Sequence, residues 1–256
     1  MLLSAPGGGG REPNTRCTGH SFRSREELFR NATNFLVTPG NNDWSDCRGY
    51  NATRDTDPIR ELWRRHFVAG SSSFHSFGQD FPGGGRPTLH RQESRPENYF
   101  FVRSEVAFFG ISQPESPSHT VDAAATEANE RWVEEHLSAD RTACTFRSIV
   151  LLSHTPPHES LYDTIDEYFE ACGAVLPILS VSGGARPRTY CMSHDVAKAR
   201  VHVTVEAFEA GPLLISVVRD PQGGGDFFHV EDTDPNNSNR QCPSFSEVKY
   251  RTYRFI

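Results

Sequence analysis

Residues 148–157 read SIVLLSHTPP, an apolar run that ends in a histidine and a proline pair. Apolar residues that follow one another without alternation are typical of a strand buried on both faces, as in a parallel sheet. The next segment has apolar residues at helical spacing, namely Leu161, Ile165, Tyr168, Phe169 and Cys172. This order of strand, loop and helix predicts an α/β fold in which helices pack against a sheet.

Further apolar segments extend this pattern in both directions. We expect a hairpin from residues 99–102 and 106–111, a helix from 122 to 137, and a strand in VLPILSV that ends in a glycine turn. Toward the C-terminus, RVHVTVEAF and LLISVVRD predict two more strands. The first of them alternates valine with polar residues, as if one of its faces met solvent. A layered α/β sandwich fits these segments best.

The N-terminal part carries weaker signals. Residues 1–16 are rich in Gly, Pro and Ser, so we expect a disordered tail before one domain that spans residues 17–256. A short helix is expected at residues 24–31, followed by a strand in FLV. The segment DPIRELWRRHFV predicts a second helix, with Asp57 as its N-cap and Pro58 at the first helical position.

Composition argues against nucleic acid as a partner and against a membrane-spanning helix. The net charge is −7 at pH 7, and the lysines and arginines do not form a basic block, so nucleic acid is not an expected partner. No apolar run approaches the roughly 18 residues of a membrane-spanning helix. The N-terminal MLLSAPGGGG has too short an apolar region for a signal peptide.

The cysteines and the glycosylation sequons indicate the cellular compartment in which the protein is expected. The chain has six cysteines and no CxxC pair, and six cysteines allow about fifteen disulfide connectivities. Sequons occur at Asn31, Asn51 and Asn236. These features favour the secretory pathway if the N-terminus is incomplete, and the cytoplasm is expected otherwise.

Possible ligands follow three of the apolar runs. Residues 41–43 (NND) follow the first run, His154 follows the second, and residues 182–184 (SGG) follow the third. In open α/β sheets, ligands bind outside the carboxyl ends of the strands. The sequence therefore predicts a site where these three loops meet.

Several blocks resemble those of the calcineurin-like metallophosphoesterases. LVTPGNNDW is similar to the GNHD/E block of that family, and closest to a branch that reads PGDNEWTDC. IVLLSHTPP resembles the block with a single His before a Pro pair, EANERWVEEHL resembles a helix that carries Trp, and VTVEAFEAGPLLISVVRDP resembles the closing strands. The resemblance runs loosely from about residue 23 to residue 230. It implies a four-layer α/β/β/α sandwich, here lacking its N-terminal strands.

The resemblance also implies a chemistry. Two divalent metal ions (Fe, Mn or Zn), about 3.5–4 Å apart, would polarise a phosphate-ester substrate and generate hydroxide from water. Matched by position, Asn41 and His154 would be metal ligands. Asn42 stands in the place of the catalytic His, where an amide cannot deliver a proton at neutral pH. Asp43 would be the acid that orients its neighbour.

The chain departs from the family pattern in two places. The DxH and GDxxD blocks are absent upstream of Phe35, and the GHxH position reads Gly183-Gly184-Ala185-Arg186. An incomplete chain would explain the first departure, whereas a degenerate homologue would explain both. We therefore expect phosphatase activity to be weak or lost, as in a pseudoenzyme, with one metal ion bound or none.

A non-catalytic binding or scaffold module on the same fold, possibly glycosylated, is the alternative. In that case Asn41 and Asn42 are turn residues. His154 is then a hydrogen-bonded core histidine at a strand end. His158 is expected at the surface in either case.

Overall fold

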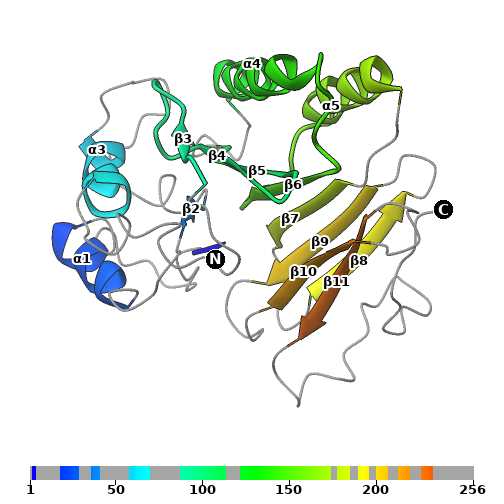
Figure 1. The fold of residues 1–256 in the computed structure, drawn as a ribbon. Helices are drawn as coiled ribbons and strands as arrows, with labels where there is room; N and C mark the ends of the chain where they lie inside the picture. The colour runs from blue at the N-terminus through cyan, green and yellow to red at the C-terminus, as the bar shows by residue number, and fades with distance from the viewer. Residues whose placement is uncertain are drawn as a thin grey trace.

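The chain forms a mixed α/β fold, so the expected fold class is confirmed at this level (Figure 1). The computed structural model describes residues 2–3, 18–28, 36–40, 58–69, 87–113, 122–173, 178–184, 190–195, 200–206, 213–219 and 226–232.

A seven-stranded sheet lies at the centre of the fold. Its strands are β3 (His90–Arg91), β4 (Tyr99–Arg103), β5 (Val106–Ile111), β6 (Ser148–Ser153), β7 (Ile178–Gly184), β8 (Tyr190–Asp195) and β9 (Arg200–Glu206). The strand order is β3-β4-β5-β6-β7-β9-β8. Strands β5, β6, β7 and β9 run parallel, whereas β4 and β8 pair antiparallel with their neighbours. The predicted hairpin and the predicted strands in β6, β7 and β9 are confirmed.

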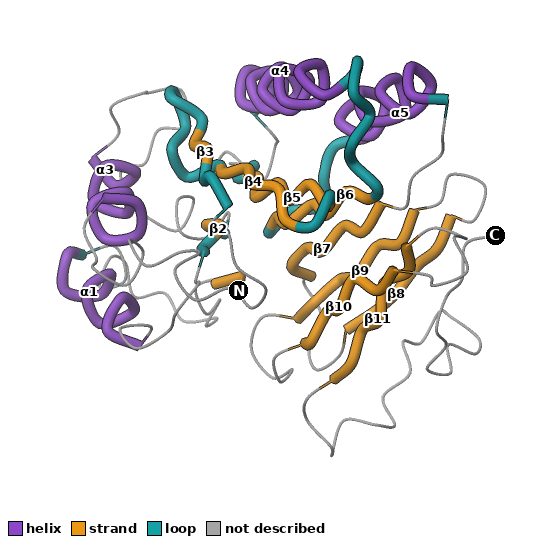
Figure 2. The backbone as a smooth tube through the Cα atoms, viewed as in Figure 1, coloured by secondary structure: helices purple, strands orange, loops and turns teal. Residues whose placement is uncertain are grey.

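Helices α4 (Ala123–Asp140) and α5 (Glu159–Cys172) cover one face of this sheet, and both helices were expected from their apolar spacing. Figure 2 shows them on the same side of the strands. The Asp122 carboxylate caps α4 by accepting a hydrogen bond from the Ala124 N–H (3.0 Å). Helix α5 ends at Gly173, whose φ of 65° is left-handed. None of the described helices is long and apolar enough to cross a membrane.

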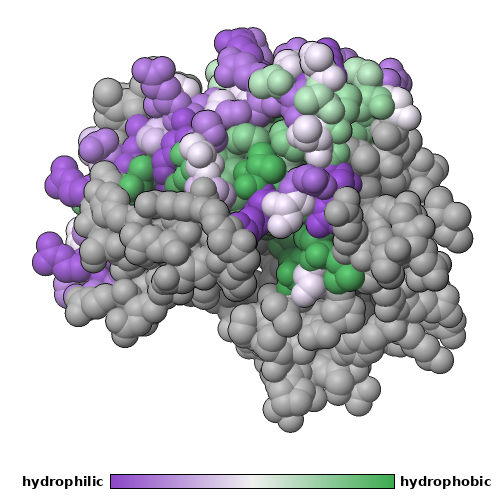
Figure 3. Space-filling model, in the orientation of Figure 1, coloured by the Kyte–Doolittle hydropathy of each residue, from purple (hydrophilic) through white to green (hydrophobic). Residues whose placement is uncertain are grey.

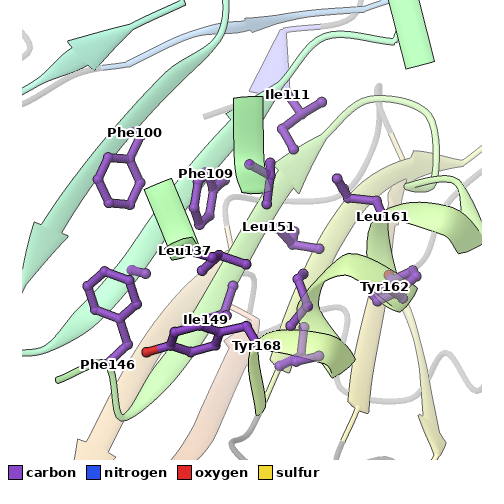
Figure 4. Packing of buried hydrophobic residues seen from close by; sticks show 14 of the residues in the cluster. Phe100, Phe109, Ile111, Leu137, Phe146, Ile149, Leu151, Leu161, Tyr162 and Tyr168 are labelled. Carbon is purple, nitrogen blue, oxygen red and sulfur yellow. The ribbon is translucent and has the colours of Figure 1, made fainter. Parts of the chain in front are cut away.

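The main hydrophobic core lies between the two helices and the sheet. Ile149 and Leu151 of β6 belong to this core together with Leu137 of α4 and Ile165 of α5. Figure 4 shows Phe109, Leu137, Leu151 and Leu161 gathered in the same space between strands and helices. Helix packing thus buries alternate residues of the central strands.

A two-stranded sheet packs against the opposite face. It consists of β10 (Leu213–Arg219) and β11 (Asp226–Asp232), paired antiparallel. Phe228 of β11 is buried there, together with the other members of this second core: Val106, Val150, Leu179, Val181, Val201 and Val203. The strand expected in LLISVVRD is confirmed as β10, although it pairs with β11 and not with the central sheet. The described residues therefore form a helical layer, a central sheet and a second sheet.

The N-terminal helix α1 (Gly19–Leu28) begins earlier than the predicted residue 24. The reason is a reciprocal cap at its start. The Ser21 N–H donates to Thr18 Oγ1 (3.2 Å), and the Thr18 N–H donates to Ser21 Oγ (3.1 Å). This start also brings Phe22 into the helix, and Phe22 is only 1% exposed.

The helix expected in DPIRELWRRHFV is confirmed as α3 (Pro58–Arg64), which continues as a wider π turn, η1 (Arg65–Ala69). The rings of Trp63 and Phe67 pack against each other in a tilted arrangement, with their centroids 5.1 Å apart. Figure 3 shows hydrophilic residues on the outer sides of α1 and α4 and hydrophobic residues toward the centre of the view. The helices thus follow the usual amphipathic arrangement.

Two residues depart from the expected disordered tail. Leu2–Leu3 form a short strand, β1, that pairs in parallel with β2 (Thr38–Pro39). Pairing gives their main-chain groups partners that a free tail lacks. Residues 4–16 lie outside the described part of the chain.

Cys144 and Cys172 form a disulfide, which is one of the pairings that six cysteines allow. It joins the loop after α4 to the last residue of α5. Beside it, the Asp140 carboxylate accepts hydrogen bonds from the Thr145 N–H (2.7 Å) and the Tyr168 hydroxyl (2.6 Å). These contacts tie the two helices together at the amino end of β6.

Gly110→Ala should strongly destabilise the fold. A Cβ at Gly110 would lie 2.1 Å from Cζ of Tyr99, whose ring is fully buried. We expect a loss of about 3 kcal/mol in the free energy of unfolding, measured by urea denaturation. Gly173→Ala is the matched control, because a Cβ there meets no atom within 4 Å, and the left-handed backbone should cost only about 1 kcal/mol. Equal losses in the two variants would contradict the packing argument.

Replacing Cys144 and Cys172 together by Ser should lower the free energy of unfolding by about 3–4 kcal/mol. The bond spans a sequence separation of 28 residues, so its loss releases a long loop in the unfolded chain. Urea denaturation of the oxidised wild type and the double variant measures this loss. Identical unfolding midpoints would show that the bond does not form in solution.

Candidate functional site

The carboxyl ends of the parallel strands meet at one edge of the central sheet. Ile111, the last residue of β5, pairs with Ser153, the last residue of β6. On the other side of β6, Leu152 pairs with Val181, so the residues that follow stand beside the end of β7. His154 therefore lies at the edge where the sequence predicts a site.

The residues of β6 alternate between the two faces of the sheet up to the point where His154 follows the strand. Ile149 and Leu151 face the helices, whereas Leu152 packs with residues of the opposite face. His154 follows β6 directly, in the loop beyond Ser153. The His154 side chain is half-buried there.

Strand β2 packs on this same face. Leu36, just before β2, belongs to a cluster with Tyr99 that also includes Leu152. The Thr38 hydroxyl donates to the Tyr99 hydroxyl (3.2 Å), and the Tyr99 ring lies over Gly110. Gly110 pairs with Leu152. Thr38, which is bonded to the tyrosine over Gly110, therefore lies close to Leu152 along the direction of the strands. The chain that leads to residue 41 thus comes close to the end of β6 that carries His154.

The other predicted site residues lie outside the described part of the chain. These are the metal ligand Asn41 and the catalytic candidates Asn42 and Asp43. Of the predicted set, the structure describes only His154. The roles of all these residues therefore remain predictions.

The loop that carries His154 is held at both ends. The Ser153 hydroxyl donates to the Thr155 carbonyl (2.6 Å). The Gln113 amide, in the orientation that satisfies both of its groups, donates to the Pro156 carbonyl (2.9 Å) and accepts from the His158 N–H (3.3 Å). The His158 side chain is 56% exposed and caps α5, so the expectation that His158 lies at the surface is confirmed.

The described residues do not fit a dinuclear metal centre. Strand β7 ends in Gly183 and Gly184, and neither residue has a side chain that could bind a metal ion. Within the described ranges, no group of three or more His, Cys, Asp or Glu side chains is placed to hold a metal ion. No catalytic step through a metal follows from these residues.

A buried polar network supports the neighbouring end of β5, and sequence reasoning did not identify it. The Asn98 amide accepts from the Ser112 N–H (2.7 Å) and donates to Asn129 of α4 (2.7 Å). The Ser112 carbonyl accepts from Arg95 (2.9 Å) and Asn129 (3.1 Å). In the sequence these residues look like an ordinary polar loop and a helix surface, because their burial arises only when β4 and α4 meet.

A buried carboxylate, Glu97, anchors α3 to this network. Three guanidinium groups surround it, from Arg60 at 2.7 Å, Arg64 at 3.1 Å and Arg95 at 3.7 Å. Burial alone would raise the pKa of Glu97, but these positive charges together lower the pKa below its ordinary value. Because Glu97 is 0% exposed, we interpret it as a structural anchor and not as a catalytic acid.

A second polar cluster lies on the helical side of the sheet. Ser180 of β7 and Nδ1 of His202 of β9 are 2.6 Å apart, and Tyr162 of α5 hydrogen-bonds to Ser180. Burial lowers the pKa of His202. Ser180 is only 1% exposed, so a substrate cannot reach this serine as a nucleophile. Val201 and Val203 of β9 are buried and His202 between them is half-buried beside Ser180. The polar residue of this alternation therefore faces the helical side of the sheet, where the sequence predicted a face that meets solvent.

Comparisons with known proteins add no family assignment. No protein-family model matches the chain, and neither curated proteins nor solved structures give a match.

Glu97→Gln should lower the free energy of unfolding at pH 7 by about 3–5 kcal/mol, because a neutral amide leaves the three guanidinium groups without their carboxylate. The lowered pKa of Glu97 also predicts the direction in which the free energy of unfolding changes with pH. The ionised Glu97 carboxylate stabilises the fold fully above the unfolded-state pKa of about 4.3. This stabilisation is lost as the pH falls through the folded-state pKa of Glu97. Urea denaturation between pH 7 and pH 3 tests both effects.

Glu127→Gln is the control for this experiment. Glu127 pairs with Arg131 at the surface, with side chains 70% and 65% exposed, and should lose less than about 0.5 kcal/mol. If Glu97→Gln behaved like Glu127→Gln and kept the pH dependence of the wild type, Glu97 would not be an anchor.

Proposed function

We propose that the chain is a calcineurin-like metallophosphoesterase domain whose hydrolytic activity is weak or lost. Its fold would be the four-layer α/β/β/α sandwich of that family, and the helical layer and the two sheets of the described residues support this proposal. Its ligand would be a phosphate ester. At most one divalent ion (Fe, Mn or Zn) would bind, through Asn41 and His154.

The observation that carries this proposal is the placement of two sequence blocks. The segment that leads to residue 41 and the strand that leads to His154 are more than 100 positions apart in the sequence. They nevertheless pack on the same face, since Leu36 and Leu152 belong to one cluster and β2 lies against β6. A phosphoesterase needs both blocks near one carboxyl edge, because both contribute ligands to the same ion.

A non-catalytic binding module on the same fold is the second candidate. The observation that favours it is the glycine pair at the end of β7, where the family has histidines. The Cys144–Cys172 disulfide is typical of proteins that mature in an oxidising compartment. Together with the sequons, it supports a glycosylated protein of the secretory pathway.

His154→Ala should abolish metal uptake if the proposed site exists. We expect the wild type to bind at most about one equivalent of Fe, Mn or Zn and to hydrolyse an aryl phosphate slowly or not at all. Elemental analysis of the purified protein and a phosphatase assay measure both quantities. In the variant, metal content should fall to background while the free energy of unfolding changes little.

His158→Asn is the matched control, because Asn replaces the capping histidine with another good N-cap. This variant should bind as much metal as the wild type. Two equivalents of metal with rapid turnover would refute the degenerate-site proposal. Metal content that is unchanged by His154→Ala would exclude His154 as a ligand.

A further inference from the structure

We propose that the contact of α4 with β3 and β4 is acid-sensitive and opens when His136 of α4 takes up a proton. The inference is independent of the proposed function. It concerns an aromatic cluster on the helical face of the sheet, which the candidate site does not include.

The His136 side chain lies between the helix and the sheet. Its ring stacks on Phe100 of β4, with the ring centroids 4.1 Å apart, and makes a T-shaped contact with Trp132 at 5.1 Å. Phe109 of β5 lies 6.2 Å away. These three aromatic residues are buried, and His136 itself is half-buried. A titratable ring thus has surroundings that would suit an apolar side chain.

No described carboxylate balances a positive charge on the His136 ring. His66, by comparison, has Glu26 at 2.8 Å. Phenyl rings face His136 from β4 and β5, and a second histidine, His90, faces it from β3 at a ring-centroid distance of 5.5 Å. Asp140, one turn further along α4, is held by the loop after the helix and by α5. A proton on His136 would therefore meet apolar rings and a neighbour that can add only positive charge.

These surroundings disfavour the imidazolium form. Burial, and to a smaller extent the neighbouring His90, lower the pKa of His136 from its ordinary 6.5 to about 4. Between these two pH values the unfolded chain binds more protons than the folded chain. The stabilisation that the neutral ring provides is therefore complete above pH 6.5 and is lost as the pH falls toward 4.

The attachments of α4 favour a local response. Its first turns are bonded to the segment before β4, because Gln92 and Arg95 donate to main-chain carbonyls of the helix (2.9 and 3.1 Å). Its last turn is tied to α5 by the bond from the Tyr168 hydroxyl to Asp140 (2.6 Å). At His136, between these attachments, ring contacts join the helix to β3 and β4. A charge on this ring would therefore act on the middle of α4 and on β3, a strand of 2 residues.

An NMR titration of the histidine ring protons tests the protonation step. The signal of His136, assigned by its absence from His136→Phe, should titrate with a pKa below about 5 in the wild type. In His90→Gln this pKa should rise but stay below 6.5, because burial remains. A wild-type value above the limit of about 5 would mean that the aromatic faces stabilise the cation, and it would overturn the inference.

His136→Phe keeps a stacking ring and removes the titration. Between pH 7 and pH 5, the unfolding equilibrium constant from urea denaturation should rise at least about tenfold more in the wild type than in this variant. His158→Asn is the matched control, because it removes an exposed histidine, and it should follow the wild type. Equal pH dependence in the wild type and His136→Phe would contradict the proposal.

Amide hydrogen exchange, corrected for the intrinsic rates, shows where the fold opens. At pH 5, the difference in protection between the middle of α4 and β7 should be at least about tenfold larger in the wild type than in His136→Phe. The same difference in both proteins would mean that protonation destabilises the whole fold without opening this contact, and it would refute the local response.

Discussion

The rest of the structure depends on the burial of β6 on both of its faces. Ile149 and Leu151 face α4 and α5, whereas Val150 and Leu152 face the second sheet and β2. A strand of this kind is stable only when two layers cover it, since each exposed apolar side chain would lose about 1.5–3 kcal/mol of burial free energy. The helical layer covers one face of β6, and the β10–β11 sheet covers the other.

Burial on both faces also determines where polar groups can stand. Main-chain groups of the parallel strands are paired within the sheet, so polar side chains are confined to the strand ends and to the joints between layers. At the amino end of β6, Asp140 and the Cys144–Cys172 disulfide fix the two helices. At the carboxyl end of β5, Asn98 and Asn129 form a polar joint beneath α4. The polar joint organises the end of the sheet where we propose that a ligand binds.

The candidate site has a possible ligand after one strand and none at the end of the next strand. His154 directly follows a central strand, β6, and the β2 segment packs on one face of that strand. The last two residues of β7, however, are glycines, which have no donor side chain. A site with ligands from one side only would favour binding over hydrolysis, because two-metal catalysis needs ions that clamp both the attacking and the leaving oxygen.

The sequence by itself determined the elements whose signals are local. Apolar runs without alternation predicted β6 and β7, valine alternation predicted β9, and helical spacing predicted α4 and α5, since these patterns record which faces are buried. The tertiary structure alone decided the pairing of Cys144 with Cys172, the departure of β10 from the central sheet, and the burial of Glu97, Asn98 and Ser112. These features arise from contacts between segments far apart in the chain. A polar residue in a loop has the same local sequence whether it meets water or a second layer, so its role became visible only when the layers were assembled.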